Sequence, residues 1–226
     1  MTSDIILKSA GFSLIVQLLT AVVGLYGITL NIAKDHYILK ELLILETTVQ
    51  IIELSYYIWL IYSFTSIKYD ITFTRYFDWI LSTPIMIIST VLYMKYRTTE
   101  NNEKSSLRLV EMFKSNATII FQILLANATM LLFGFLGEKK ILSRTNAFIG
   151  GSIMFLIEFF AIYYYYVKND VINKALFWFM FSFWGLYGVA FCFSYSAKNT
   201  TYNILDIFSK NFYGLFLFNE VRKLSL

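Results

Sequence analysis

Asp206 and Lys210 lie one helical turn apart in the stretch LDIFSK, inside a segment that is otherwise apolar enough to cross a membrane. A charged side chain is costly in hydrocarbon, so the pair indicates either a functional site or a structural ion pair between helix faces. The functional interpretation is a lysine that forms a Schiff base, with the aspartate as counterion of the resulting cation. A second carboxyl group from another helix would favour that interpretation.

The stretch RYFDWILSTPIMIIST, residues 75–90, supplies a second carboxyl group. Arg75 and Asp78 are three residues apart, and Ser82 lies one turn after Asp78 on the same helix face, where its hydroxyl can bond the carboxylate. Pro84, the only proline in the chain, follows within the same segment. Two apolar segments therefore each carry an aspartate near a cation, which favours chemistry over simple packing.

These two stretches resemble the motifs of the microbial (type I) rhodopsins, whose third helix carries Arg-Tyr-x-Asp-Trp-x-x-Thr-Thr-Pro and whose seventh carries Asp-x-x-x-Lys. The resemblance covers the whole chain and implies an all-trans retinal bound covalently to Lys210 as a protonated Schiff base. It also implies that Asp78 and Asp206 are the counterions, with Asp78 as proton acceptor. Arg75 would balance the two carboxylates electrostatically.

The same resemblance implies a retinal pocket of aromatic and hydroxyl side chains, namely Trp79, Ser82, Thr83, Phe177 and Trp184. The sixth apolar segment contains FWFMFSFWGLYG, residues 177–188. Against the family pattern Trp-x-x-Tyr-Pro-x-x-Trp, Phe177 is placed at the first tryptophan and Trp184 at the second. In this register Met180 replaces the tyrosine and Phe181 replaces the proline.

Two further acids lie in ELLILETTVQIIELSYY, residues 41–57. Glu46 and Glu53 are seven residues apart, about two turns along a face that also carries Gln50. Lipid-facing acids would be costly, so this face either lines a polar path or is hydrogen-bonded within a closed bundle. Ser13, Glu46 and Asn211 resemble the central gate of channelrhodopsins, and Glu53 resembles an acid near their outer vestibule.

Three functions stay open at this point. The family's proton-donor position, eleven residues after Asp78, is Ser89, which cannot supply a proton at neutral pH. The chain most resembles the viral rhodopsins of large algal viruses, a branch that includes cation channels, and we expect a light-gated cation channel rather than an enzyme. The alternatives are an outward proton pump, with Asp78 as acceptor and Glu46 as donor, and a photosensor.

The elements that must position these residues are seven apolar segments, each long enough to cross about 30 Å of hydrocarbon. They are 9–33, 39–65, 71–95, 112–137, 142–167, 171–196 and 199–223. The composition is 58% hydrophobic, with a mean hydropathy of +0.60, which excludes an ordinary soluble domain. The sequence therefore predicts an all-α, multi-pass membrane protein with a single seven-helix retinal-binding domain, residues 1–226.

The net charge of +4 is interpreted as loop charge flanking the membrane segments rather than as a nucleic-acid site. The distribution of lysine and arginine predicts an outside N-terminus and a cytoplasmic C-terminus. One cysteine and one histidine predict no cysteine- or histidine-based metal site. The expected partners are the lipid bilayer, transported cations or protons, and further copies of the chain in a homo-oligomer. Asn199 begins an Asn-Thr-Thr sequon and is expected outside as a glycosylation acceptor.

Overall fold

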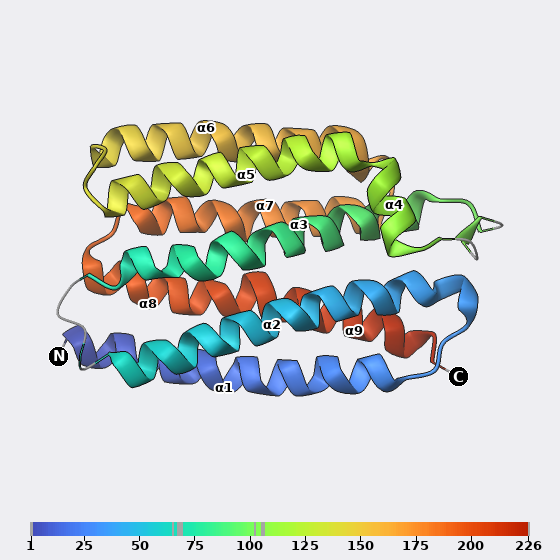
Figure 1. Cartoon of the computed structure of the whole chain (residues 1–226), viewed down its shortest axis with the longest axis horizontal. Coiled ribbons are helices and arrows are strands. Elements are labelled where there is room, and N and C mark those ends of the chain that lie inside the picture. Colours follow the sequence, from blue (N-terminus) through green and yellow to red (C-terminus); the bar gives the residue numbers. More distant parts are fainter. Residues whose placement is uncertain (1, 65, 67–69, 102, 105–106, 226) are drawn as a thin grey trace.

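The structure is a computed structural model and describes residues 2–64, 66, 70–101, 103–104 and 107–225. The described residues are almost entirely helical, and six of their helices are long and apolar enough to cross a membrane. A further helix completes the predicted seven-helix bundle, because the last span is divided into shorter pieces. Figure 1 shows the long helices side by side, with the N-terminus and the C-terminus at opposite ends of the bundle.

The elements follow one another in a simple order along the chain. The first three spans are α1 (Thr2–Thr29), α2 (Tyr37–Ser63) and α3 (Arg75–Thr98), with the short turns η1 (Lys34–His36) and η2 (Thr72–Thr74) before α2 and α3. Next come α4 (Leu109–Ser115), α5 (Ala117–Glu138), α6 (Arg144–Ile162) with its π-helical end η4 (Tyr163–Val167), and α7 (Val171–Phe191). The last span consists of α8 (Tyr195–Asp206), the π-helical segment η5 (Ile207–Asn211) and α9 (Phe212–Lys223).

Several predicted segment boundaries differ from the observed helices, among them those of the fourth and the first segments. The fourth predicted segment, 112–137, is interrupted at Asn116, where the side-chain amide donates to the Met112 carbonyl at 2.9 Å and so competes with the backbone. The first helix begins earlier than predicted, and an ion pair between Lys8 and Asp4, 3.0 Å apart at i,i+4, supports its polar first turns. The predicted end of the second segment, residue 65, lies outside the described residues.

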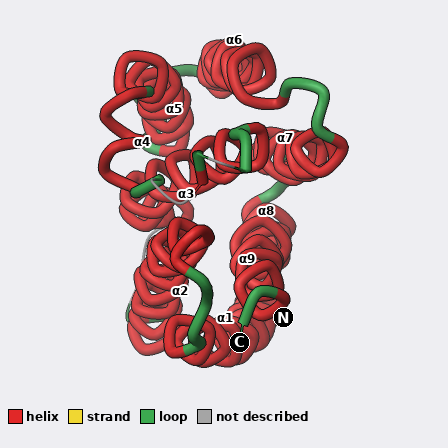
Figure 2. Tube along the Cα trace, turned by 90° about the vertical axis from the view of Figure 1, so that its right-hand side faces the viewer, coloured by secondary structure: helices red, strands yellow, loops and turns green. Residues whose placement is uncertain are grey.

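The seven spans form a closed ring in which α1, α2, α3, α5, α6, α7 and the last span pack in turn, and the last span packs against α1. In the end-on view, α3 and α7 lie between the α5–α6 pair and the group formed by α1, α2 and α9 (Figure 2). Side chains that point inward from α2, α3, α7 and the last span therefore share one interior. All of the charged residues singled out in the sequence lie on these four elements.

Apolar and polar side chains are distributed as expected for a protein in a bilayer. Large hydrophobic residues such as Phe12, Leu19 and Phe160 are exposed on the outside of the ring. The interior holds an apolar core and also an unusual number of buried polar groups, including Arg75 and Lys210. Because the bilayer core offers no water as a hydrogen-bond partner, these polar groups must form hydrogen bonds with one another inside the ring. The prediction of a multi-pass membrane protein is confirmed.

Candidate functional site

Lys210 lies at the centre of a cluster of carboxyl groups in the middle of the bundle. Its Nζ is 2.6 Å from Asp78 Oδ2, to which it donates a hydrogen bond, and 3.7 Å from Asp206 Oδ1. A third carboxyl group, Glu53, lies 3.4 Å from the same nitrogen, and all four side chains are at most 3% exposed. Glu53 therefore belongs to the lysine cluster and not to an outer vestibule, because α2 crosses the last span at this depth.

The π-helical segment η5 contains Lys210 and loosens the regular backbone pairing there. Single π turns inside α-helices often occur at functional sites, because the extra residue re-aims the side chains that follow. The Lys210 carbonyl accepts a hydrogen bond from Gln50 Nε2 at 3.1 Å, so α2 holds this part of the last span. Gln50 was expected on the face shared by Glu46 and Glu53, and it is buried there.

Asp206 is held from three sides. Its two carboxylate oxygens accept hydrogen bonds from the hydroxyls of Tyr57 and Tyr187, each at 2.7 Å, and Arg75 Nη1 lies 3.6 Å away. In contrast, Asp78 Oδ1 has no hydrogen-bond partner among the described residues, and Asp78 Oδ2 accepts a hydrogen bond from Lys210 Nζ. Asp206 is thus fixed by its neighbours, whereas Asp78 depends on the lysine. Neither tyrosine was predicted from the sequence, although Tyr57 follows Glu53 by one turn.

Arg75 is fully buried and is bound by residues of the last span. Its Nε donates to Asn199 Oδ1 at 3.1 Å and its Nη2 donates to the Asn199 carbonyl at 3.2 Å and to Asn203 Oδ1 at 2.5 Å. Asn199 is itself 0% exposed and donates to Thr72 Oγ1 at 2.9 Å. The expectation that Asn199 is a glycosylation acceptor was therefore wrong, because α8 turns this amide inward. Asn199 instead accepts hydrogen bonds from Arg75.

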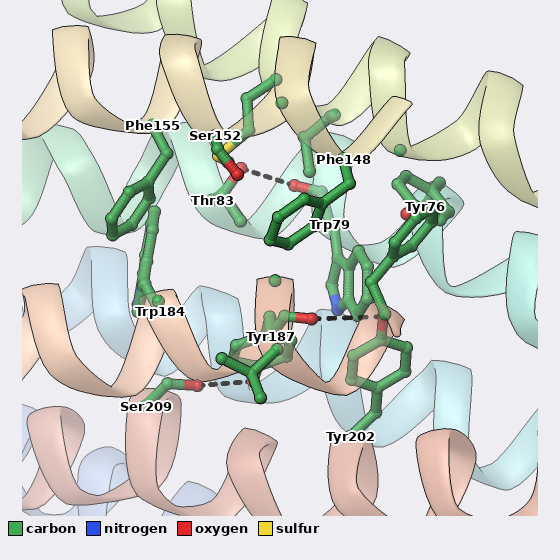
Figure 3. Close-up of a pocket in the computed structure, with 18 of the residues that line it drawn as sticks. Tyr76, Trp79, Thr83, Phe148, Ser152, Phe155, Trp184, Tyr187, Tyr202 and Ser209 are labelled. Carbon is green, nitrogen blue, oxygen red and sulfur yellow. Dashed lines mark hydrogen bonds between the residues drawn. The ribbon is translucent and has the colours of Figure 1, made fainter. Parts of the chain in front are cut away.

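A cavity of about 320 Å³ extends from Lys210 between α3, α5, α6 and α7. Eight of the 22 residues that line it are aromatic, and Figure 3 shows Trp79, Phe155, Trp184 and Tyr202 around it. Of the five predicted pocket residues, Trp79, Thr83 and Trp184 line this cavity. Ser82 is buried near the Asp78 carboxyl instead, and Phe177 lines a smaller neighbouring cavity.

The position of Phe177 corrects the register predicted for the sixth span. Trp184 lies in the cavity, and Tyr187, three residues later, bonds the Asp206 carboxylate. Trp184, Tyr187, Gly188 and Phe191 therefore match the pattern Trp-x-x-Tyr-Pro-x-x-Trp, with glycine in place of proline and phenylalanine in place of the last tryptophan. The predicted register was seven residues too early. Seven residues are about two helical turns, so both registers present aromatic residues on the same face.

The predicted gate residues are all buried, but they bind different partners. Glu46 accepts a hydrogen bond from the Ser89 hydroxyl of α3. Ser13 accepts from Gln17 Nε2 at 2.9 Å on its own helix, and Asn211 Oδ1 accepts from Thr20 Oγ1 at 2.5 Å. Ser13, Glu46 and Asn211 form no direct hydrogen bond with one another in this structure. Ser13 and Asn211 are linked through Gln17 and Thr20 of α1, because Thr20 Oγ1 also donates to the Gln17 carbonyl at 3.1 Å, whereas Glu46 bonds α3.

The residues around this cavity fit the retinal that the sequence resemblance implies. The volume lies within the range of about 300–1,000 Å³ typical of small-molecule sites, and the aromatic walls suit an apolar polyene. Lys210 and Ser209 line the cavity, so a primary amine is available inside an otherwise apolar site. The carboxyl groups beside that amine can compensate a positive charge kept there after covalent attachment.

Comparisons with known proteins give one family and one fold. A family model described as bacteriorhodopsin-like protein matches residues 8–224. The crystal structure of the viral rhodopsin OLPVRII is similar at 25% identity, with 98% of this chain and 99% of that chain covered and a TM-score of 0.85. The proton pumping rhodopsin AR2 from the marine alga Acetabularia acetabulum is similar at 16% identity, with coverages of 97% and 95% and a TM-score of 0.73, which shows the fold alone. A search of curated proteins finds no match.

Proposed function

This chain belongs to the bacteriorhodopsin-like family, and from that premise we propose that it is a light-gated cation channel. Membership of the family implies a retinal chromophore and, in general terms, light-driven ion transport or photoreception. When bound, retinal supplies light absorption and a change of shape. The remaining parts of the mechanism concern what the residues of this chain do around it.

Lys210 would hold retinal covalently through Nζ, with the polyene in the aromatic cavity. The amine nitrogen lies 2.6 Å from Asp78 and 3.4 Å from Glu53, so these two carboxyl groups would face the positive charge most directly. Asp206, already bonded by two tyrosines, would supply a fixed negative charge behind them. A cation in low dielectric needs such compensation, because desolvation otherwise disfavours its charged form.

A buried polar seam between α1, α2 and the last span is the observation that carries the channel proposal. Thr20 Oγ1 donates to Gln50 Oε1 at 2.9 Å and also contacts Asn211, while Gln17 contacts Ser13 one turn away. The seam consists of Ser13, Gln17, Thr20, Glu46, Gln50, Glu53, Asn203 and Asn211, all at most 8% exposed. Polar groups in this number are costly inside a membrane unless they bond one another or line a path for water and ions, and we propose that this seam lines such a path once it opens.

The seam is closed at two points in this structure. At one end Arg75 fills the space between Tyr57, Asn199 and Asn203. Nearer the other end, the bond from Ser89 ties Glu46 to α3. We propose that the Glu46 contact is the light-sensitive closure, because α3 also supplies Thr83 and Trp79 to the wall of the cavity. A movement of α3 relative to α2 would separate the two side chains and admit water.

Voltage-clamp recording under illumination tests the channel directly. A channel gives a photocurrent that reverses sign near the equilibrium potential of the permeant cation, and the reversal potential moves when the cation gradient is changed. A current of one direction at all voltages would refute the channel and favour a pump. The absence of any current from a correctly inserted, retinal-loaded protein would favour a photosensor.

The alternative of a proton pump is favoured by one observation, namely the contact of Glu46 with Ser89. Ser89 occupies the expected proton-donor position, and the structure places a carboxyl group against it from α2. Glu46 could thus take over as donor, with Asp78 as acceptor beside Lys210. The substitution Glu46→Gln separates the two functions, since it keeps the size and removes the proton-donating acid.

In a channel, Glu46→Gln should change relative cation permeability or current size and leave the visible absorption band intact. In a pump, the same variant should slow the proton-return step, and added azide should restore it. Glu41→Gln is the matched control, because Glu41 lies on the same helix but accepts a hydrogen bond from the Leu109 backbone N–H at 2.8 Å, away from the seam. If Glu46→Gln behaved like the control, neither role would stand.

A further inference from the structure

The retinal cavity reaches the outside of the bundle on one side. Trp79 and Trp184 are buried in its walls and are only 6% and 8% exposed. Leu156 of α6 and Val189 of α7 line the same cavity, yet they are 55% and 49% exposed. The cavity therefore comes to the surface where α6 and α7 face each other. In a membrane this surface lies against the hydrocarbon of the bilayer.

Two phenyl rings of α6 lie opposite glycines of α7 at this point. Phe148 and Phe155 are about two turns apart on α6, and both rings point toward the cavity (Figure 3). A Cβ atom added at Gly188 would lie 3.9 Å from the Phe148 ring, and one added at Gly185 would lie 3.6 Å from the Phe155 ring. Among the described residues, no other side chain from a different helix would come within 4 Å of either added atom. The two helices therefore leave free space between the rings.

The interface of α6 with α5 is tight by the same measure. A Cβ atom added at Gly150 of α6 would lie 2.6 Å from the Phe133 ring of α5. One added at Gly137 of α5 would lie 2.6 Å from the Ala147 side chain of α6. Such separations are well below the optimal distance between non-bonded carbon atoms, so α5 and α6 are in direct contact without room for a ligand. Of the two interfaces, the one with α7 is the open one.

An apolar ligand would meet bonded polar groups toward both ends of the bundle. Toward one end Arg75 forms an ion pair with Asp206, and toward the other Ser89 donates a hydrogen bond to Glu46. A polyene that entered along the bundle axis would separate these partners and leave buried polar groups unsatisfied. Retinal is itself apolar and dissolves in hydrocarbon, and the space between α6 and α7 is lined by apolar residues apart from Ser152. A sideways route therefore has the lower barrier.

We propose that retinal passes from the bilayer into the cavity between α6 and α7, through a lateral gap bordered by Phe148, Ser152, Phe155, Gly185 and Gly188. Ser209, the neighbour of Lys210 in the last span, lies across the cavity from Ser152 (Figure 3). The aldehyde end would therefore reach Lys210, and the ring end would stay beside the lateral gap. This inference rests on retinal attachment at Lys210 and not on ion conduction.

A retinal analogue that carries an alkyl chain on its ring tests whether the lateral gap is open. Wild type in liposomes should form a visible band with all-trans retinal and with this analogue, because the chain can extend through the gap into the bilayer. Gly188→Leu should form the band with retinal but not with the analogue. Gly11→Leu is the matched control, since a Cβ atom added at Gly11 of α1 meets nothing within 4 Å. A wild type that binds retinal but excludes the analogue would overturn the proposal.

The rate at which the visible band forms tests the route. When all-trans retinal is added to liposomes that contain the retinal-free protein, Gly188→Leu should form the band about tenfold more slowly than wild type, because the added side chain obstructs the path. Phe148→Ala should form it faster, because one of the two rings that border the lateral gap is removed. Gly11→Leu should match wild type.

Equal rates in wild type, Gly188→Leu and Phe148→Ala would overturn the lateral gap as the entrance. If Gly188→Leu bound no retinal at all, Phe148→Ala would decide alone: a faster rate supports the entrance and an unchanged rate refutes it. A wild type without any visible band would refute retinal attachment itself. If the rates change as expected in a protein that gives no photocurrent, the channel fails and the entrance stands.

Discussion

The two halves of the bundle on either side of Lys210 treat buried charge differently. We call the half that contains the start of α3 the Arg75 half. There Arg75 forms an ion pair with Asp206, and Lys198 Nζ lies 2.7 Å from Glu138 Oε1. In the opposite half, here the Glu46 half, Glu46 and Glu158 are buried and bond only a hydroxyl and an amide group among the described residues. The buried acids named in the Arg75 half are paired with cations, whereas Glu46 and Glu158 in the other half have no cation within 4 Å among the described residues.

This difference separates a rigid half from one that can change its hydration. Breaking a buried ion pair leaves an uncompensated charge, so the Arg75 half resists rearrangement. A neutral acid bonded to a hydroxyl group can exchange its partner for water at a much smaller cost. The light-sensitive closure is therefore expected in the Glu46 half, and the predictions below are ordered from the largest effect to the smallest.

Lys210→Ala should abolish retinal attachment completely, because the variant lacks the amine that lines the cavity. The measurement is the visible absorption of the purified protein after retinal is added. Lys198→Ala is the matched control, since Lys198 is also buried, at 5% exposure, but is paired with Glu138 and does not line the cavity. A retained visible band in Lys210→Ala would show that the lysine of the cluster is wrongly assigned.

Arg75→Gln should destabilise the protein by about 3–5 kcal/mol, because it leaves the carboxyl cluster with one cation fewer in a buried site. Thermal loss of the visible band reports the change. Arg144→Gln serves for comparison: Arg144 donates to the Phe191 carbonyl but makes no ion pair within 4 Å among the described residues, so its loss should cost less. Equal losses in the two variants would remove the distinction drawn for the Arg75 half.

Asp78→Asn should shift the absorption maximum to longer wavelength and slow the photocycle. Asp78 Oδ2 is the closest carboxylate oxygen to Lys210 Nζ, at 2.6 Å, and its removal destabilises the positive charge in the ground state relative to the excited state. Spectra and flash photolysis of the variant provide the measurement. An unchanged spectrum and photocycle would transfer the counterion role to Asp206 and Glu53, both of which remain within 4 Å of the lysine.

Asp170→Asn should have the smallest effect, within about 0.2–1 kcal/mol, since its partner Arg97 is partly exposed at the end of the Glu46 half. The hydrogen bonds from Arg97 hold the pKa of the Asp170 carboxyl below its ordinary value. A lowered pKa in the folded state means that the stabilisation is present above the unfolded-state pKa and is lost as pH falls through the folded one. Thermal stability measured across that acidic range should therefore converge for wild type and variant at low pH.

The sequence by itself determined the number of spans, the membrane class and the central pair of motifs. Hydrophobic segments of sufficient length, with Asp78, Asp206 and Lys210 inside them, identify these features without any contact between helices, because each depends only on local spacing and on the cost of charge in hydrocarbon. The structure places these three residues together, as the resemblance implied. The roles assigned to them stay predictions until they are measured.

Only the tertiary structure decided the depth and the partners of the remaining residues. A helical face repeats about every seven residues, so periodicity could not distinguish Phe177 from Trp184 in the sixth span, a difference of about 10 Å along the axis. Periodicity likewise gave Glu53 a face without saying which residue of another span lies opposite. That Glu53 lies beside Lys210 and that Asn199 bonds Arg75 follow from how the helices pack, since the members of each pair come from spans far apart in the sequence.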